Sequence, residues 1–343
     1  MASIGFVLSD EQFPATELVE LGAAAEQAGF DMVWCSDHFH PWQDNQGHGG
    51  LAWITLAALG QRQNRIPMGT GVTCPTYRYN PAIVAQGFAT LATLYPGRIF
   101  LGVGSGEAVN ELPTTGQWHD YEARSKRMVE AVTLIRHLWQ GNWVDFRGDY
   151  YQVQGAKLYD PPPQMIPIYI AASGPESMRL AGHYGDGLVT GTETLTDQEA
   201  MNAFREGAEK AGKNVAQLPI TVEAWAFVGN QSDAQKAAEK WRFVPKAWGK
   251  YVDNPDPRDI QRRAEADVPI EEAMKGWAIC DDPDVHIKAL QKLIDAGATN
   301  IFVHSAQEDQ QGMIDFYGEH VLPRIDHQVM QPSSPVQETA HAH

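Results

Sequence analysis

The chain has little of several features that would define a protein class. Only three of its 343 residues are cysteine. Cys35, Cys74 and Cys280 are too widely separated for a disulfide framework, and no CxxC pair suggests zinc. No apolar run is long enough to span a membrane, and no basic segment opens the chain. These absences predict a cytoplasmic protein with no membrane partner.

Positive charge is also scarce. The chain has 26 Lys and Arg against 43 Asp and Glu, for a net charge of -17. The field of such a protein repels nucleic acid and anionic lipid, which excludes both as partners. A small anion is not excluded, because a local group of cations or a helix N-terminus can bind one. With 43% apolar residues, we expect a globular protein that acts on a small molecule.

The organisation indicates one domain. Neither an internal repeat nor a linker interrupts residues 1–326, and we expect a single domain there. Residues 327–343 are polar and contain two prolines, which predicts a disordered tail.

Short apolar runs alternate with amphipathic segments for most of the chain, which predicts repeated βα units and therefore parallel strands. Eight such strands can close into a (β/α)8 TIM barrel, with an open doubly wound sheet as the alternative. Residues 143–153 and 241–282 read as insertions, the first as a hairpin. Strands are predicted at 4–8, 32–35, 66–72, 99–103, 166–171, 187–190, 220–228 and 301–304, and helices at about 16 onwards, 53–61, 81–94, 121–139, 175–184, 197–211, 234–241 and 313–325.

Residues 36–42 place an acid, an imidazole and an indole directly after a predicted strand. Loops at the carboxyl ends of parallel strands are the usual place for catalytic residues. Asp37, His38 and Trp42 are therefore candidates for chemistry. The alternatives are that Asp37 caps a turn, that His38 is a surface imidazole and that Trp42 only packs.

A second motif has glycines at 102, 104 and 106, followed by Glu107. Its GxGxG spacing is not the dinucleotide fingerprint, and no ribose-binding acid follows at the expected distance. If this strand is the fourth of a barrel, Glu107 emerges on the same face as Asp37 and His38, an arrangement suited to acid/base work across a planar cofactor. The alternative is that Glu107 caps the next helix.

Other signals are weaker. Gly71-Val72 ends a predicted strand and could form a bulge against a ring system. Residues 171–177 lead into a helix with an early proline, where free amides could receive a phosphate. His38, His40 and His48 do not have convincing metal-ligand spacing, so we expect no metal. Neither a GxSxG elbow nor a P-loop is present.

Together these segments resemble one family. Residues 36–42, the Gly71-Val72 step with 77–81, residues 102–111 and residues 171–175 look like the bacterial-luciferase-like barrels that use coenzyme F420, an 8-hydroxy-5-deazaflavin. They are most similar to F420-dependent glucose-6-phosphate dehydrogenases, and the resemblance extends from about residue 4 to residue 324.

The resemblance implies roles for individual residues. His38 would take the hydroxyl proton, Glu107 would act as the acid toward the deazaflavin, and Trp42 would stabilise the intermediate state, although which of His38 and Glu107 is base and which is acid stays open. Gly71-Val72 would be a non-prolyl cis bond behind the ring. The implied cofactor contacts are Asp37, Gly71, Val72, Cys74, Ser105, Gly106, Asn110, Ser173, Gly174, Glu176 and Ser177.

The implied substrate positions are Glu11, Gly191, Thr194, Arg263 and Gly276. At the four positions where the glucose-6-phosphate enzymes hold the phosphate, only Arg263 is a cation. Losing charge-assisted contacts weakens binding of a dianion. We therefore predict a dehydrogenase that oxidises a sugar or other alcohol and is not specific for glucose 6-phosphate. The alternative is a sugar phosphate bound differently, with Lys275 or Arg262 in place of the missing cations.

Two other functions are weighed against this one. The first is an FMN-dependent monooxygenase on the same barrel, and the second is a noncatalytic cofactor-binding protein. Deazaflavin has carbon where flavin has nitrogen at position 5, so it passes hydride and activates oxygen poorly, which favours the dehydrogenase. Barrels of this family usually dimerise, so the resemblance also implies a homodimer.

Overall fold

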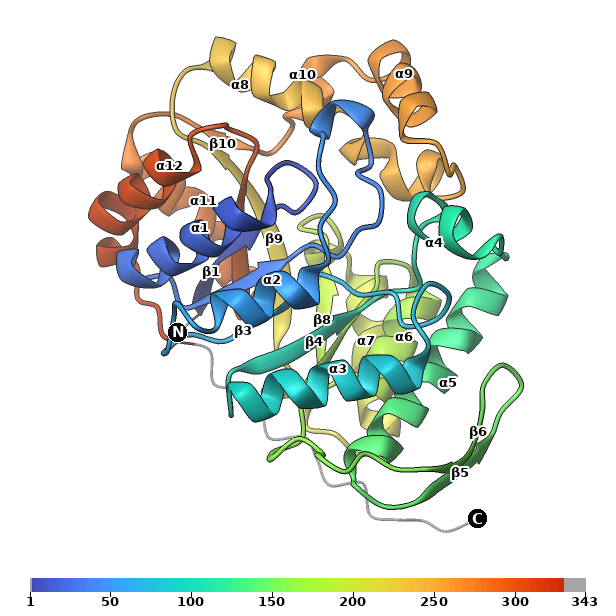
Figure 1. Cartoon of the computed structure of the whole chain (residues 1–343). Helices are drawn as coiled ribbons and strands as arrows, with labels where there is room; N and C mark the ends of the chain where they lie inside the picture. The colour runs from blue at the N-terminus through green and yellow to red at the C-terminus, as the bar shows by residue number, and fades with distance from the viewer. Residues whose placement is uncertain (1, 330–343) are drawn as a thin grey trace.

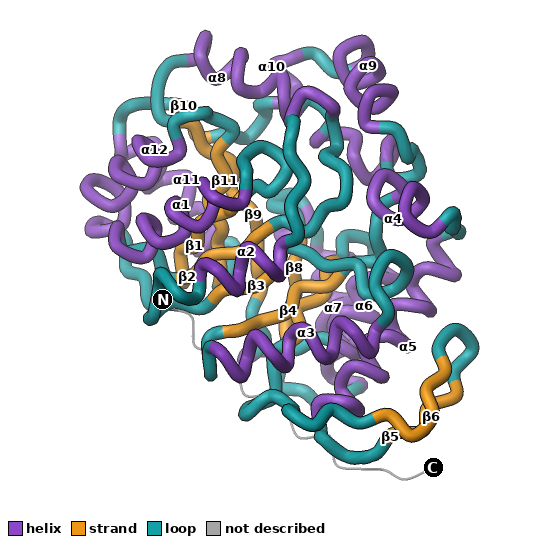
Figure 2. The backbone as a smooth tube through the Cα atoms, in the orientation of Figure 1, coloured by secondary structure: helices purple, strands orange, loops and turns teal. Residues whose placement is uncertain are grey.

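The computed structural model describes residues 2–329. Eight parallel strands close into a barrel, because β9 pairs with both β8 and β11. Helices surround the barrel (Figures 1 and 2). The barrel strands are β1 (Ser3–Leu8), β2 (Met32–Cys35), β3 (Met68–Thr70), β4 (Ile99–Val103), β7 (Ile168–Ala171), β8 (Gly187–Thr190), β9 (Ile220–Phe227) and β11 (Asn300–Ser305).

All eight predicted strands are present, and the barrel is confirmed over the open sheet. Several helices begin where the sequence places a polar residue before proline: the side chains of Asn80, Asp256 and Asp282 each accept a backbone N–H at the start of a helix. The helices are α1 (Ala15–Ala28), α2 (Ala52–Leu59), α3 (Pro81–Leu94), α4 (Ala108–Thr115), α5 (Tyr121–Trp139), α6 (Pro175–Tyr184), α7 (Gln198–Lys210), α8 (Gln231–Ala238), α9 (Pro257–Asp267), α10 (Ile270–Ala273), α11 (Pro283–Asp295) and α12 (Gln310–Phe316).

Two inserted segments lie outside the barrel. The first is the antiparallel hairpin of β5 (Val144–Arg147) and β6 (Gln152–Ala156), close to the predicted one. The second lies between β9 and β11 and contains α8 to α11 and the short strand β10 (Ala278–Ile279). Its helices α9 and α11, and helix α4 after β4, were not predicted. Short single-turn helices complete the chain, among them η2 (Thr194–Thr196), η4 (Glu239–Trp241), η5 (Val244–Lys246) and η6 (Ala247–Tyr251).

The core has two layers. Large side chains from the inner faces of the strands fill the barrel, with Phe302 of β11 stacked on Trp34 of β2 at 3.9 Å between ring centroids. A larger apolar layer lies between the strands and the helices. The filled interior leaves the two ends of the barrel for binding, and the polar loops lie at the carboxyl ends of the strands.

The ordered chain extends beyond the predicted domain end. His327 forms a bridge with Ala2, and its Nδ1 is 2.7 Å from Asp31 Oδ2. Residues 327 and 328 are thus held against the barrel, whereas the predicted tail began at 327. The rest of that tail, residues 330–343, lies outside the described residues.

Candidate active site

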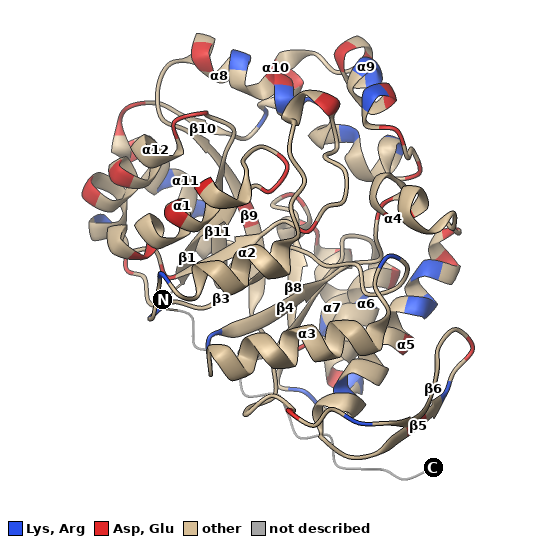
Figure 3. Ribbon diagram, in the orientation of Figure 1, with Lys and Arg blue, Asp and Glu red and all other residues tan. Residues whose placement is uncertain are grey.

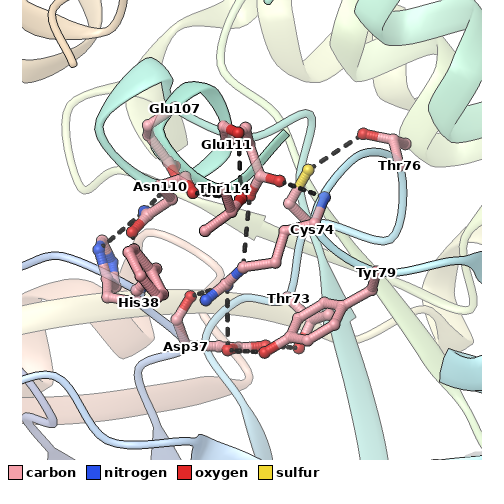
Figure 4. A network of polar contacts seen from close by, with 12 residues as sticks. Asp37, His38, Thr73, Cys74, Thr76, Tyr79, Glu107, Asn110, Glu111 and Thr114 are labelled. Atoms are coloured by element: carbon pink, nitrogen blue, oxygen red, sulfur yellow. Dashed lines mark hydrogen bonds and ion pairs between the residues drawn. The ribbon is translucent and has the colours of Figure 1, made fainter. Parts of the chain in front are cut away.

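Polar side chains from the loops after β2 and β4 meet at the mouth of the barrel. Asn110, in the first turn of α4, lies between His38 and Glu107 (Figure 4). Its Nδ2 is 2.9 Å from His38 Nδ1 and 3.2 Å from Glu107 Oε2. Glu107 directly precedes α4, but its side chain makes no capping hydrogen bond. The two predicted acid/base residues therefore share one amide.

The orientation of Asn110 fixes the tautomer of His38. Asn110 Oδ1 accepts the backbone N–H of Phe39 at 2.8 Å and that of His40 at 3.3 Å. The amide nitrogen must therefore face the imidazole, and Nδ1 of His38 is an acceptor. In the neutral imidazole the hydrogen is on Nε2.

Glu11 lies beside that nitrogen. Its Oε1 is 3.3 Å from His38 Nε2, and its Oε2 accepts the hydroxyl of Ser36 at 2.5 Å. Glu11 was predicted to bind substrate, and the structure places its carboxylate in direct contact with His38. Both side chains are largely buried, so the pair is shielded from bulk water.

Both carboxylate oxygens of Asp37 accept hydrogen bonds from other side chains of the protein. Its Oδ2 accepts the hydroxyl of Thr73 at 2.6 Å, and its Oδ1 accepts Tyr79 at 2.9 Å and Arg78 Nη2 at 3.1 Å. The side chain is fully buried. In this arrangement both carboxylate oxygens hold the loop after β3. The sequence predicted a cofactor contact for Asp37 and assigned no role to Arg78 or Tyr79.

The glycine run makes room for that same loop. The peptide bond between Gly71 and Val72 is cis, as the resemblance implied. A Cβ on Gly104 would lie 2.9 Å from Val72 Cγ2, and one on Gly106 would lie 2.6 Å from Cys74 Sγ. Gly106 also has a φ of 84°, which side chains rarely adopt. The GxGxG spacing therefore lets two neighbouring loops approach each other at the mouth.

Cys74 and Glu111 are buried behind these glycines. Burial raises the pKa of the Cys74 thiol well above its usual range, and the nearby Glu111 carboxylate raises it further. The thiol is therefore protonated at neutral pH and is not a nucleophile. Burial also raises the pKa of Glu111 to about 7, against the opposing effect of Arg78. Nothing in the sequence pattern marked Glu111 as an unusual acid.

Aromatic rings form another wall of the mouth. Trp42 stacks on Phe243 at 5.0 Å and meets the edge of Trp248 at 5.7 Å, while the His38 ring is 6.3 Å away. Phe243 and Trp248 belong to the insertion after β9. Trp42 is thus held beside His38 by residues distant in sequence.

The amino end of α6 forms an exposed rim. Ser173, Gly174 and Glu176 are exposed, and no side chain caps the helix. Ser177 instead donates to the carbonyl of Gly174 and accepts the N–H of Ser173. The first amides of this helix are therefore without a side-chain cap, and anion binding there stays a prediction. Ser105 is partly buried at the end of β4, on the same side of the mouth.

The cations near the predicted phosphate positions each lie beside a carboxylate. The Nε of half-exposed Arg263 is 2.7 Å from Asp259 Oδ2, one turn earlier on α9. Lys275, beside Gly276, is 4.0 Å from Glu193, which lies between Gly191 and Thr194 in the loop after β8. A carboxylate thus lies close to each of these two cations and offsets part of its charge.

Residues 2–329 show neither a metal cluster nor a membrane-spanning helix. No group of three His, Cys, Asp or Glu side chains there is arranged to hold a metal. No helix in that range is both long and apolar enough to cross a membrane.

Comparisons with known proteins give a consistent result. The family model for luciferase-like monooxygenases matches residues 3–300. An F420-dependent hydroxymycolic acid dehydrogenase of Mycobacterium tuberculosis is 48% identical, covering 94% of this chain and 88% of its own. An F420-dependent glucose-6-phosphate dehydrogenase of Rhodococcus jostii is 42% identical, covering 94% and 97%. A solved F420-dependent secondary alcohol dehydrogenase, in complex with an F420–acetone adduct, has a TM-score of 0.89 at 34% identity, covering 95% and 99%.

Proposed function

Since this chain belongs to the luciferase-like family, we propose that it is a dehydrogenase that uses coenzyme F420 and oxidises the C–OH group of an alcohol or sugar. The observation that carries the proposal is the pairing of His38 and Glu107 through Asn110. Relatives that share 48% and 42% of the sequence over most of its length are F420-dependent dehydrogenases.

The residues at the mouth fit the cofactor. The Gly71-Val72 bulge, Cys74, Ser105 and Gly106 form one flank. The uncapped amides of α6 offer a place for the cofactor's phosphate, with Ser173, Gly174, Glu176 and Ser177 around it. When bound, the deazaflavin supplies the hydride acceptor.

Oxidation of an alcohol also requires that a proton leave the hydroxyl. We assign this to His38, whose Nε2 is 3.3 Å from Glu11 Oε1. Transfer of the Nε2 hydrogen to the carboxylate frees Nε2 to accept the substrate proton. Glu107 stands at the other side of Asn110, and we assign it to the proton at the deazaflavin. Trp42, packed beside His38, excludes water from the reacting centre.

The substrate side favours a neutral alcohol over a sugar phosphate. The one cation at the predicted phosphate positions, Arg263, is paired with Asp259. A dianionic phosphate would therefore meet one guanidinium whose charge Asp259 already offsets. We therefore propose that glucose 6-phosphate is not the preferred substrate.

A homodimer is part of the proposal. Helices α2 and α3 carry no Asp, Glu, Lys or Arg (Figure 3), and Trp53 of α2 packs on Phe88 of α3. Ile54 is 66% exposed and Ile83 is 53% exposed. A second copy would bury this uncharged face.

A cytoplasmic location is proposed too, supported by three free cysteines.

The test is an alcohol and sugar screen that follows loss of the oxidised deazaflavin absorbance. We expect turnover with neutral alcohols and a much higher KM for glucose 6-phosphate. A parallel titration with FMN is the control, and tight FMN binding with oxygen consumption would overturn the proposal. His38→Ala should lose most turnover while it still binds F420, and unchanged turnover would contradict its role.

A further inference from the structure

The inward face of β9 carries a carboxylate that the reaction described above does not use. Phe302 of β11 stacks on Trp34 of β2 although β1 lies between these strands, so Phe302 points into the barrel. His304 follows two residues later on the same face. Glu223 Oε1 is 2.8 Å from His304 Nδ1, so Glu223 also faces the interior.

This carboxylate is reachable from outside, although its partner is not. The side chain of Glu223 is 33% exposed and that of His304 only 5%. An inward-facing residue of a closed barrel reaches solvent through the mouth, because the strands seal its walls. Glu223 therefore lies on the floor of the mouth, on the side of β8, β9 and β11. The predicted cofactor contacts are on the opposite side, after β2, β3, β4 and β7.

The imidazole behind Glu223 is held at both nitrogens. His304 Nε2 is 2.7 Å from Ser9 Oγ, and Nδ1 faces Glu223 Oε1. Because Nδ1–H donates to the carboxylate, Oε1 is occupied. Within residues 2–329 the structure gives Oε2 no hydrogen-bond partner. One acceptor oxygen on the floor is therefore available to a ligand.

The surrounding rings decide which kind of donor fits. The Trp225 indole is stacked between the His304 ring at 3.9 Å and the Trp277 ring at 5.0 Å. Trp241 meets the His304 ring edge-on at 4.5 Å. Both faces of Trp225 are covered, so no face is open for a cation to lie on. A donor here must therefore bind through the carboxylate oxygen, and the C–OH substrates of the proposed function supply a hydroxyl for it.

We propose that the substrate of this chain carries a second hydroxyl group, which donates a hydrogen bond to Glu223 Oε2 while the first hydroxyl reacts at His38. The proposal rests on the proposed function, and it narrows the substrate class to neutral diols and polyols. A hydrogen bond to a charged acceptor is worth about a 10- to 100-fold difference in kcat/KM between a diol and the matching mono-alcohol.

The test compares matched alcohols with the full chain and F420: 2-butanol against 2,3-butanediol, and 2-pentanol against 2,4-pentanediol. We expect the wild-type protein to favour the diols by about tenfold or more in kcat/KM. Glu223→Leu should abolish this preference and leave the mono-alcohols within about threefold of wild type, because Glu223 does not contact the hydroxyl that reacts at His38. Since Glu223→Leu also removes the acceptor of His304 Nδ1, a second variant keeps that acceptor. Glu223→Gln, which keeps an acceptor for His304, should show an intermediate preference.

The matched control is Ser9→Ala, which removes the other partner of His304 without touching Glu223 Oε2. It should keep the diol preference, and a loss of the preference in both variants would mean that Glu223 acts only through packing. Turnover of mono-alcohols with no diol preference in the wild type would overturn this proposal and leave the dehydrogenase intact, as would a preference for 3-amino-2-butanol over the diol. Turnover of none of these alcohols, with F420 bound, would overturn both.

Discussion

Asp10 is a buried acid whose removal should stabilise the protein in a pH-dependent way. Its side chain is fully buried, and neither carboxyl oxygen has a hydrogen-bond partner among the described residues. Its pKa is raised from 3.8 to about 7, first by burial and then by the Glu11 and Asp37 carboxylates, against smaller opposing effects of the Gly50 backbone and Arg78.

The sign of the effect follows from proton binding. In the unfolded chain Asp10 titrates at its ordinary, lower pKa, so between the two pKa values the folded state binds more protons. The free energy of unfolding therefore falls as the pH rises from about 4 to about 7. A shift from 3.8 to about 7 corresponds to at most roughly 4 kcal/mol. Asp10→Asn removes this pH-dependent loss of unfolding free energy, because the amide does not ionise.

The measurement is urea unfolding of both proteins at pH 5 and at pH 8. The buried amide also lacks partners, which costs about 1 to 3 kcal/mol, but that cost is the same at both pH values. We expect the variant to gain about 1 to 3 kcal/mol relative to wild type between pH 5 and pH 8. A difference that does not change with pH would refute the reasoning.

As a control, Asp186→Asn removes a carboxylate that accepts a charge-assisted bond from Arg136 at 2.8 Å and the backbone N–H of Ile168 at 2.9 Å. It should destabilise the protein at pH 8, which is opposite in sign to Asp10→Asn. The contrast separates an unpartnered buried acid from a paired one.

Three further predictions concern the mouth and the uncharged helices. Asn110→Ala should lower kcat about 100-fold, because the His38 imidazole becomes free to rotate. The control, Asn300→Ala at the other end of the barrel, should change only the unfolding midpoint, and equal losses of kcat in the two variants would contradict the prediction. Gly106→Ala should lower the free energy of unfolding in urea by about 2 to 4 kcal/mol, because the new Cβ would contact Cys74 Sγ and the residue has a positive φ. Adding Cys74→Ala should recover part of this loss, and a double variant no more stable than Gly106→Ala would contradict the contact with Cys74. Ile54→Glu should halve the mass measured by light scattering, and an unchanged mass would exclude this face from the interface.

The sequence was sufficient for the fold because each strand is a short apolar run followed by a helical pattern. The eight strand positions were confirmed, and the loops after strands two and four met as predicted. The helices within residues 241–282 were harder to predict. Their helices pack as a separate group around Trp241, Phe243 and Tyr251, and a polar helix such as α9, with its arginines and acids, has few apolar positions from which to read a period.

Side-chain partners could not be read from the sequence, because they depend on residues far apart in the chain. Asp37 was marked by its place after a strand, yet its oxygens are taken by Thr73, Arg78 and Tyr79, about 40 residues later. Glu223 sits in the middle of a strand with no motif around it, and its partner His304 is 81 residues away. Only strand alternation places it inside the barrel.

The geometry of Asn110 also constrains where protons can reside during the reaction. One amide hydrogen is directed at His38 Nδ1 and the other at Glu107 Oε2, so neither of those atoms can carry a proton without facing another donor. A proton on His38 is thereby directed to Nε2, which faces Glu11, and a proton on Glu107 to Oε1. Since the backbone N–H groups of Phe39 and His40 hold Asn110 Oδ1, the amide cannot turn over to relieve either conflict. A single asparagine therefore selects the atom of each residue that would carry a proton in the proposed reaction.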